Sequence, residues 1–411
     1  MKAIQTAKWG LFLLLAMFLM WRVVSVNIAQ HAANQPIENA GIWQVDTPEI
    51  QLSDASELMT LDPAKAYQMA LRGAWQYPAD GRYFVLLAIM LERNQQIEEA
   101  RNLIRQLSQL SPRTPNVQLQ IGNFWARQGE LKLAMTSWGV AIQMQPQLRT
   151  VVFPTLLTIA EVPQNYNQVK EVFSRSHDWA DEFFMYAVRN AAYIDTLKLL
   201  YSARMSGKNA QTDAMRRAYL DRLVRESLWT DAFFVWMNSL SDEQMKSLAN
   251  VFDGGFEREA PEEGYAWRFA GNDSLRIMAE PTIGASGKRA LHVGLLGTQR
   301  VPNLLASQRL LLDEGQYRFA GRIKVDNMAA VNGIRWEVVC LGPNARQLLA
   351  TEYFVDKMPW RNFGQAFEVP AGCEAQELRL TVHPADAKRP NLTGSVWFDE
   401  LSVTFQVGVV R

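Results

Sequence analysis

The sequence predicts a multidomain chain, α then β: an N-terminal transmembrane helix, an α-helical solenoid and a C-terminal antiparallel β-sandwich. Three observations predict it. An apolar run lies near the N-terminus, small and bulky apolar residues recur in the middle of the chain, and from Val251 short segments alternate between apolar and polar residues. With 411 residues, 48% of them hydrophobic, the chain has room for several cores. We place a membrane helix at 1–29, a polar tether at 30–60, helices at 61–249 and the sandwich at 250–411.

The charge balance and the reactive side chains of the sequence argue against two classes of function, nucleic-acid binding and catalysis. Lysine and arginine together number 42, as do aspartate and glutamate, and no basic run is present. This balance argues against nucleic acid as a partner. The four histidines are His31, His177, His292 and His383; none pairs at metal spacing, and no HExxH, CxxC or GxSxG motif occurs. We therefore predict a binding protein that is not an enzyme and that requires no cofactor.

The first residues predict an uncleaved signal anchor. Two lysines precede an apolar run from Trp9 to Trp21, and apolar residues continue past Arg22 to Ile28. If Arg22 snorkels to the interface, the run approaches the roughly 20 residues that span a bilayer. The lysines favour a cytoplasmic N-terminus, so we expect a single pass through a bacterial inner membrane, with the body in the periplasm. A cleaved signal peptide is the alternative.

Residues 115–147 contain the pattern on which the helical prediction depends. Small and bulky apolar residues share one helical face, a turn glycine follows, and a second such face ends at a proline: Ile121, Gly122, Trp125, Gly129, Ala134, Trp138, Ala141 and Pro146. Shifting this pattern back by 34 residues places Ala100 on Ala134 and Pro112 on Pro146. The spacing resembles the tetratricopeptide repeat, whose helix pairs stack into a solenoid. An ordinary helical bundle with small residues at tight crossings is the alternative.

A solenoid of this kind implies a protein partner on its concave face. Polar residues beside the small positions are the candidate contacts: Arg93, Gln120, Asn123 and Arg127. The alternative for each is a solvated helix face. Trp125 and Trp138 occupy packing positions, so we do not expect them to bind a ligand.

The C-terminal third reads as short strands separated by Gly, Pro, Asn and Asp, which is typical of a β-sandwich. In 317–325, apolar and polar residues alternate strictly, which predicts one buried face. The expected strands are Tyr265–Ala270, Ser274–Ala279, Ala290–Leu296, Leu304–Leu312, Gln316–Val325, Gly333–Cys340, Gln347–Val355, Gln365–Val369, Leu378–Val382 and Ser395–Phe405.

Four motifs in this region resemble the galactose-binding-like jelly rolls of carbohydrate-binding modules. They are Gly-Gly-Phe-Glu at 254–257, Glu-Gly-Gln-Tyr-Arg-Phe-Ala-Gly-Arg at 314–322, Trp-Arg-Asn-Phe at 360–363 and Gly-Ser-Val-Trp-Phe-Asp-Glu-Leu-Ser-Val at 394–403. The resemblance implies a structural calcium ion held by Glu257 and Asp399, since calcium prefers carboxylate oxygens. The alternative is that backbone amides satisfy both acids.

Sugar binding requires exposed rings that stack on pyranose faces, with polar neighbours for the hydroxyls. Trp267 and Trp360 are the candidates for that role. Trp336 occupies every second position together with Ile334, Val338 and Cys340, so we expect it in the core. Core packing is also the alternative for Trp267 and Trp360.

Cys340 and Cys373 are the only cysteines. In an oxidising compartment, two thiols in one small domain are expected to form a disulfide. Closing a loop of this length stabilises the fold by about 3–4 kcal/mol on a chain-entropy model. The alternative is two buried free cysteines.

The architecture resembles accessory proteins of exopolysaccharide assembly or export. That resemblance implies a membrane-anchored scaffold whose helical repeats dock a protein partner and whose jelly roll binds or positions a glycan. Two alternatives stay open: an assembly factor for an envelope complex with no sugar binding, and an enzyme that acts on polysaccharide.

Overall fold

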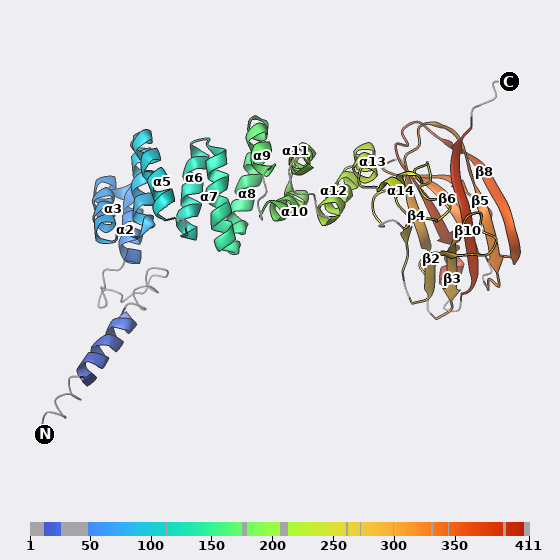
Figure 1. Cartoon of the computed structure of the whole chain (residues 1–411), viewed down its shortest axis with the longest axis horizontal. Coiled ribbons are helices and arrows are strands. Elements are labelled where there is room, and N and C mark those ends of the chain that lie inside the picture. Colours follow the sequence, from blue (N-terminus) through green and yellow to red (C-terminus); the bar gives the residue numbers. More distant parts are fainter. Residues whose placement is uncertain are drawn as a thin grey trace, which may run out of the picture. The chain divides into compact units, whose positions relative to one another are not determined.

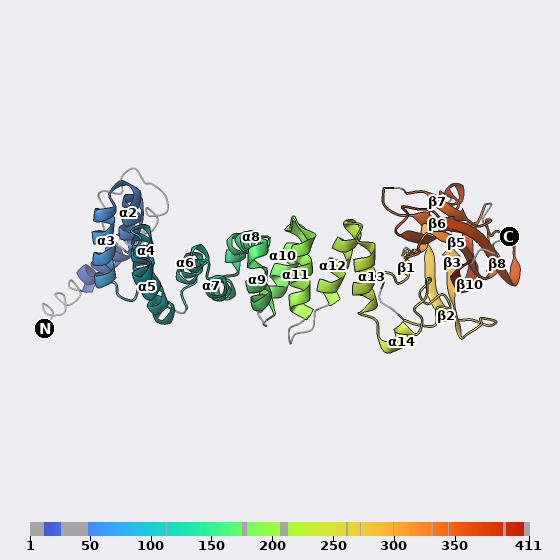
Figure 2. The ribbon, with the colours of Figure 1, turned by 90° about the horizontal axis from the view of Figure 1, so that it is seen from above.

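The structure, a computed structural model, divides into two compact units, residues 1–210 and 211–411. It is drawn in Figures 1 and 2. The residues it describes are 12–25, 48–111, 113–174, 179–205, 213–259, 262–271, 273–298, 300–329, 332–343, 345–388 and 392–406.

Residues 12–25 are helical, and most of their apolar side chains are exposed. Within the described ranges, no helix combines the length and the hydropathy that crossing a membrane requires. The remaining residues of the expected anchor, 1–11 and 26–29, lie outside the described residues, as does the part of the expected tether at 30–47.

The prediction that the polar tether continues to residue 60 is wrong, because residues 48–61 form helix α2 (Pro48–Leu61). Its composition is polar, but it packs on α3 (Pro63–Gln76) and buries Ala55 there. The Tyr83 hydroxyl group bonds to the Pro48 carbonyl oxygen at 3.2 Å. Tertiary contacts of this kind outweigh a weak local preference for helix.

The first unit is a row of paired helices (Figures 1 and 2). The helical prediction is confirmed here, and resemblance to the tetratricopeptide family stays a prediction. After α2 and α3 come α4 (Gly81–Arg93), α5 (Ile97–Leu110), α6 (Pro115–Arg127), α7 (Leu131–Met144), α8 (Arg149–Ala160), α9 (Tyr166–Phe173), α10 (Ala180–Asn190) and α11 (Ile194–Met205), with short 3-10 turns at Pro146–Leu148 and Pro163–Asn165.

Local signals set where these helices begin and end. Asp62 caps α3 by accepting from the Lys65 amide at 3.1 Å, with Pro63 in the first turn. Asp80 caps α4 in the same way, through the Arg82 amide. Between α6 and α7, Gly129 adopts a φ of +74°, which ends the helix at little steric cost.

Small residues allow the paired helices to approach closely. A Cβ added at Gly122 of α6 would lie 2.3 Å from the Trp138 ring of α7. Ala134 and Ala141 are fully buried on the facing side of α7, and Ala100 of α5 is equally buried one repeat earlier. The recurring small positions are therefore packing positions, as the spacing predicts.

The second unit contains helices α12–α14, which precede a two-sheet β-sandwich, and this confirms the predicted antiparallel sandwich. One sheet has the order β1-β4-β9-β6-β7 and the other β2-β3-β10-β5-β8. The elements are α12 (Asp213–Arg225), α13 (Trp229–Met237), α14 (Asp242–Met245), β1 (Arg268–Phe269), β2 (Leu275–Pro281), β3 (Arg289–Leu296), β4 (Leu304–Leu310), β5 (Gly315–Asp326), β6 (Ile334–Cys340), β7 (Gln347–Ala350), β8 (Met358–Val369), β9 (Gln376–Val382) and β10 (Thr393–Phe405), with a helical turn at Pro384–Ala387.

The strand connections are those of a jelly roll. The β2–β3 and β6–β7 connections are hairpins within a sheet, and the other connections between these strands pass from one sheet to the other. All the pairings are antiparallel, and β5 lies between β10 and β8. In β5, Tyr317 to Val325 alternate between core and outside as expected. Strand β8 begins at Met358, seven residues before the predicted Gln365, so it includes Trp360.

The predicted disulfide is present: Cys340 at the end of β6 is bonded to Cys373, with a Cα–Cα distance of 5.7 Å. It joins β6 to the turn that precedes β9, and both cysteines are buried in the core.

Helices α12–α14 belong to the same compact unit as the sandwich. Trp236 of α13 packs edge-on against Phe252 at 5.1 Å between ring centroids. Tyr265 donates from its hydroxyl group to the Trp229 carbonyl oxygen at 2.7 Å, and Arg216 pairs with the buried Glu263 at 2.8 Å. The domain boundary that the sequence places at 249/250 thus lies inside this unit.

Candidate functional site

The outer face of the β2-β3-β10-β5-β8 sheet carries a groove of about 900 Å³, which we call the sheet groove. Its floor is formed by outward-facing residues of β5, β8 and β10, among them Ala320, Asn362 and Ser402. One wall is the segment 246–258, which runs from the end of α14 into the sandwich. Pockets of this size accommodate small ligands and short stretches of polymer.

Arg318 of β5 lines the sheet groove with an exposed side chain. A Cβ added at Gly364 of β8 would lie 2.7 Å from its Nη2 atom, so the guanidinium group lies over this glycine. Among the described residues, no hydrogen-bond or ion-pair partner contacts the Arg318 side chain. It therefore presents donors to the groove that a ligand can use.

The other cations of the sheet groove are already paired. Lys246 and Arg258 both bind Glu243, at 2.5 Å and 2.8 Å. These two contacts lower the pKa of Glu243. Arg322 donates to the Ser286 hydroxyl oxygen at 2.7 Å and to the Gly284 carbonyl oxygen at 3.1 Å.

The carboxylates on the wall of the groove accept bonds from backbone amides. Asp253 accepts from the amides of Glu257 and Arg258 at 3.1 Å and 3.0 Å. Burial raises the pKa of Asp253, and these amide bonds oppose the rise. Its carboxylate therefore holds the turn at residues 253–258 together.

The two acids proposed to bind calcium, Glu257 and Asp399, lie near each other beside Gly255. Glu257 Oε1 accepts from the amides of Lys288 and Arg289 at 2.7 Å and 2.9 Å. Asp399 Oδ2 accepts from the Ser286 amide at 2.7 Å, and burial raises the pKa of Asp399. These donors match the alternative in which backbone amides satisfy both acids. Among the residues that are described, no group of three His, Cys, Asp or Glu side chains is placed to hold a metal, and the calcium ion stays a prediction.

Trp360 lies against the same loop, residues 282–288, to which Glu257 and Asp399 bind. Its Nε1 atom donates to the Ile283 carbonyl oxygen at 3.1 Å. The Arg322 guanidinium group lies 5.1 Å from the ring centroid, as in a cation–π contact. Half-buried in this way, Trp360 holds the β2–β3 loop in place.

The glycan-binding role predicted for Trp267 is wrong. Its side chain is 6% exposed and lies in the core, where it packs against Phe256 at 5.2 Å and Trp336 at 5.8 Å between ring centroids. The sheet interior covers both ring faces, so a sugar cannot stack on them. Trp336 is in the core as predicted.

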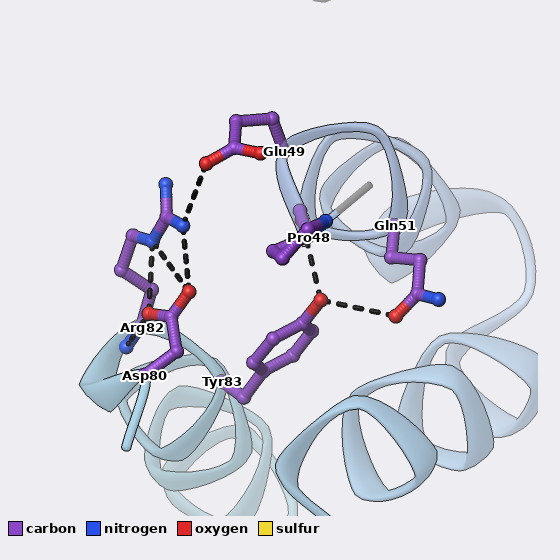
Figure 3. Close-up of polar contacts among 6 residues, drawn as sticks. All are labelled: Pro48, Glu49, Gln51, Asp80, Arg82 and Tyr83. Atoms are coloured by element: carbon purple, nitrogen blue, oxygen red, sulfur yellow. Dashed lines mark hydrogen bonds and ion pairs between the residues drawn. The ribbon is translucent and has the colours of Figure 1, made fainter. Parts of the chain in front are cut away.

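A second groove, of about 550 Å³, lies in the first unit among α2, α4 and α6, and we call it the helix groove. Figure 3 shows its polar end, where Arg82 is held by Asp80 at 2.6 Å and by Glu49 at 3.0 Å. These partners raise the pKa of Arg82, so it is always charged. Apolar side chains form most of the remaining lining: Leu52, Met59, Val85, Leu86, Ile89 and Val117.

Of the four residues predicted on a concave face, Gln120 lines the helix groove. Asn123 instead accepts a hydrogen bond from Trp138 Nε1 at 3.0 Å, which ties α6 to α7. Arg127 pairs with Glu92 at 2.7 Å, and Arg93 donates to the Met59 carbonyl oxygen at 3.4 Å. The last three residues therefore hold neighbouring helices together.

Sequence reasoning did not single out Arg318 or Arg82. The alternation of β5 already placed Arg318 on the outer face, but nothing in the sequence shows that it has no partner. Arg82 follows a helix cap, and its second acid, Glu49, lies 33 positions away in α2, a helix that the sequence did not predict.

No family profile matches this chain, and no curated protein matches it. Among solved structures it is similar to a family 4 carbohydrate-binding module, at 14% identity over 38% of this chain and 99% of that one, with a TM-score of 0.27. It is also similar to the xylan-binding domain CBM22-1 of Xyn10C from Paenibacillus barcinonensis (12% identity, 35% and 87% covered, TM-score 0.26). A third is TmCBM61 in complex with β-1,4-galactotriose (15% identity, 39% and 98% covered, TM-score 0.25).

Proposed function

We propose that the second unit binds a glycan chain in the sheet groove. The observation that carries this proposal is the groove itself: it is open, about 900 Å³ in volume, and floored by small and polar side chains of β5, β8 and β10. Small residues such as Ala320 leave room for a sugar ring, and Asn362 and Ser402 offer groups that pair with hydroxyls.

Binding of the full chain to a panel of immobilised polysaccharides tests this proposal. We expect Ala320→Phe to weaken binding at least tenfold, because the new ring fills the floor of the groove. Met278→Phe is the matched control, since Met278 is exposed on β2 of the same face and lies outside the groove. Equal binding by the two variants contradicts the proposal.

We further propose that the first unit docks an apolar segment of an envelope protein in the helix groove. Its support is the apolar lining with one charged end, the arrangement that peptide-binding grooves use. A photo-crosslinking residue placed at Ile89 is expected to capture that protein. The same residue at Leu133, which is exposed on α7, is expected to capture nothing; equal capture at both positions contradicts the docking site.

Together these two activities describe an envelope scaffold that brings a glycan to a protein partner, in exopolysaccharide assembly or export. The apolar leader and the Cys340–Cys373 disulfide support a position outside the cytoplasm, anchored at the inner membrane. Phosphatase fusions after residue 411 test the location: activity is expected only if the C-terminus is exported. An assembly factor with no sugar binding is the alternative, and failure of the polysaccharide panel favours it.

A further inference from the structure

We propose that the sheet groove selects an acidic glycan, and that Arg318 binds the carboxylate of its sugar. This inference rests on the proposed function and adds the chemical class of the ligand. The juxtaposition that carries it is an unpaired guanidinium group in a groove whose other charges already have partners.

The Arg318 side chain is free to bind a ligand. Its guanidinium group lies over Gly364, whose lack of a Cβ allows the group to approach strand β8 closely. Within the described residues it has no acidic partner, although ion pairs are common elsewhere in this unit. A planar guanidinium group offers paired N–H donors that match the two oxygens of a carboxylate.

The other charged side chains around Arg318 already have partners. Lys246 and Arg258 share the single carboxylate of Glu243, so both cations of that wall already have an acidic partner. The acids Asp253 and Glu257 are satisfied by backbone amides, as described above. Among the described cations of the sheet groove, Arg318 is therefore the one that has no acid beside it and can pair with an anionic ligand.

The acids near Arg318 restrict the kind of anion that the groove can bind. The groove also contains Glu400, 3.9 Å from Arg322, and the acids of the wall. Such mixed charge suits a polymer with spaced single charges better than one with dense phosphates, whose charges would meet these carboxylates. Uronic acids have one carboxylate on each sugar and hydroxyls around it, which fits one free arginine beside Asn362 and Ser402.

The test uses the full chain with polygalacturonate, alginate and hyaluronate, each compared with its own carboxyl-reduced form. We expect at least one acidic polymer to bind, and its reduction to weaken binding about tenfold or more, as losing a charge-assisted bond does. Arg318→Gln is expected to weaken binding of the acidic form by a similar factor and to leave binding of the reduced form unchanged. Arg276→Gln is the control, because Arg276 lies on β2 outside the groove.

The outcomes separate the inference from the proposed function. If acidic and reduced polymers bind equally and Ala320→Phe still weakens binding at least tenfold, the groove binds glycans and the acid selectivity is overturned. If Arg318→Gln and Arg276→Gln weaken binding equally, the attraction is a diffuse charge effect and Arg318 has no special role. If no polymer binds in either form, the proposed function fails and the inference fails with it.

Discussion

At the scale of single residues, most of the candidate residues turned out to hold the fold together. Asn123 and Arg127 join neighbouring helices, and Glu257, Asp399 and Trp360 all bind the β2–β3 loop. A residue type that suits a ligand also suits a backbone amide or a neighbouring ring. Only the partners that surround a side chain in the folded chain distinguish the two roles.

Gly122 is a residue whose role the packing defines. We expect Gly122→Ala to lower the free energy of unfolding by about 1–2 kcal/mol: the new Cβ collides with the buried Trp138, and overpacking costs about 1–3 kcal/mol. The higher helix propensity of alanine offsets this loss of stability by about 1 kcal/mol at most. Urea unfolding followed by circular dichroism measures the change. Gly271→Ala, where an added Cβ meets nothing within 4 Å, is the control; an equal loss there contradicts the packing argument.

His292 is expected to make the sandwich less stable in acid. Burial lowers the pKa of His292 below its usual 6.5, although Glu280 lies 2.9 Å from its Nδ1 atom and opposes the shift; Arg276 adds to it. The unfolded chain then binds a proton that the folded chain does not, so stability is complete above about pH 6.5 and falls as the pH drops below it.

The matched measurement is the melting temperature of the wild type and of His292→Gln between pH 7.5 and 5. We expect the variant to lose less stability over that range than the wild type. A steeper loss in the variant would mean that the Glu280 contact, rather than burial, controls His292.

At the scale of elements, strands were easier to predict than the ends of the helical array. In β5, successive residues face the core and the solvent in turn, so the sequence itself shows an apolar–polar alternation with a period of two residues. Helix α2 has no comparable stripe of apolar residues, and its contacts come from α3 and α4. The first part of β8 was missed because Trp360, Arg361 and Asn362 all lie at least partly exposed near a register shift.

The disulfide is an element-scale prediction. We expect replacing both Cys340 and Cys373 by alanine to destabilise the sandwich by about 3 kcal/mol or more, because it opens a loop of 33 residues and leaves space in the core. Thermal unfolding with and without reductant measures this. Reductant is expected to lower the melting temperature of the wild type and to leave that of the double variant unchanged. If complete reduction leaves the melting temperature of the wild type unchanged, the disulfide does not stabilise the sandwich.

At the scale of the whole molecule, the change from helix to strand does not mark the end of a folding unit. Helices α12–α14 precede the change but belong with the sandwich. Their aromatic residues meet those of the following segment, as Trp236 does with Phe252 and Tyr265. A boundary drawn from periodicity therefore cuts through a shared core.

The consequence is a prediction for fragments. A fragment of residues 211–411 is expected to give one cooperative thermal transition. A fragment of 250–411, which lacks Trp236 and Trp229, is expected to melt at a lower temperature or to aggregate, since Phe252 and Tyr265 lose their cover. Calorimetry of both fragments measures the difference. Equal melting temperatures would show that α12–α14 contribute nothing to the sandwich.

The sequence by itself determined the order of helices and strands, the core face of β5, the packing role of the small residues and the cysteine pairing. Each depends on a period or a spacing, which is a local property of the chain. Only the tertiary structure decided that residues 48–61 are helical, that Trp267 is buried and that Arg318 is unpaired. Those facts depend on neighbours that are distant in sequence, and no local pattern contains them.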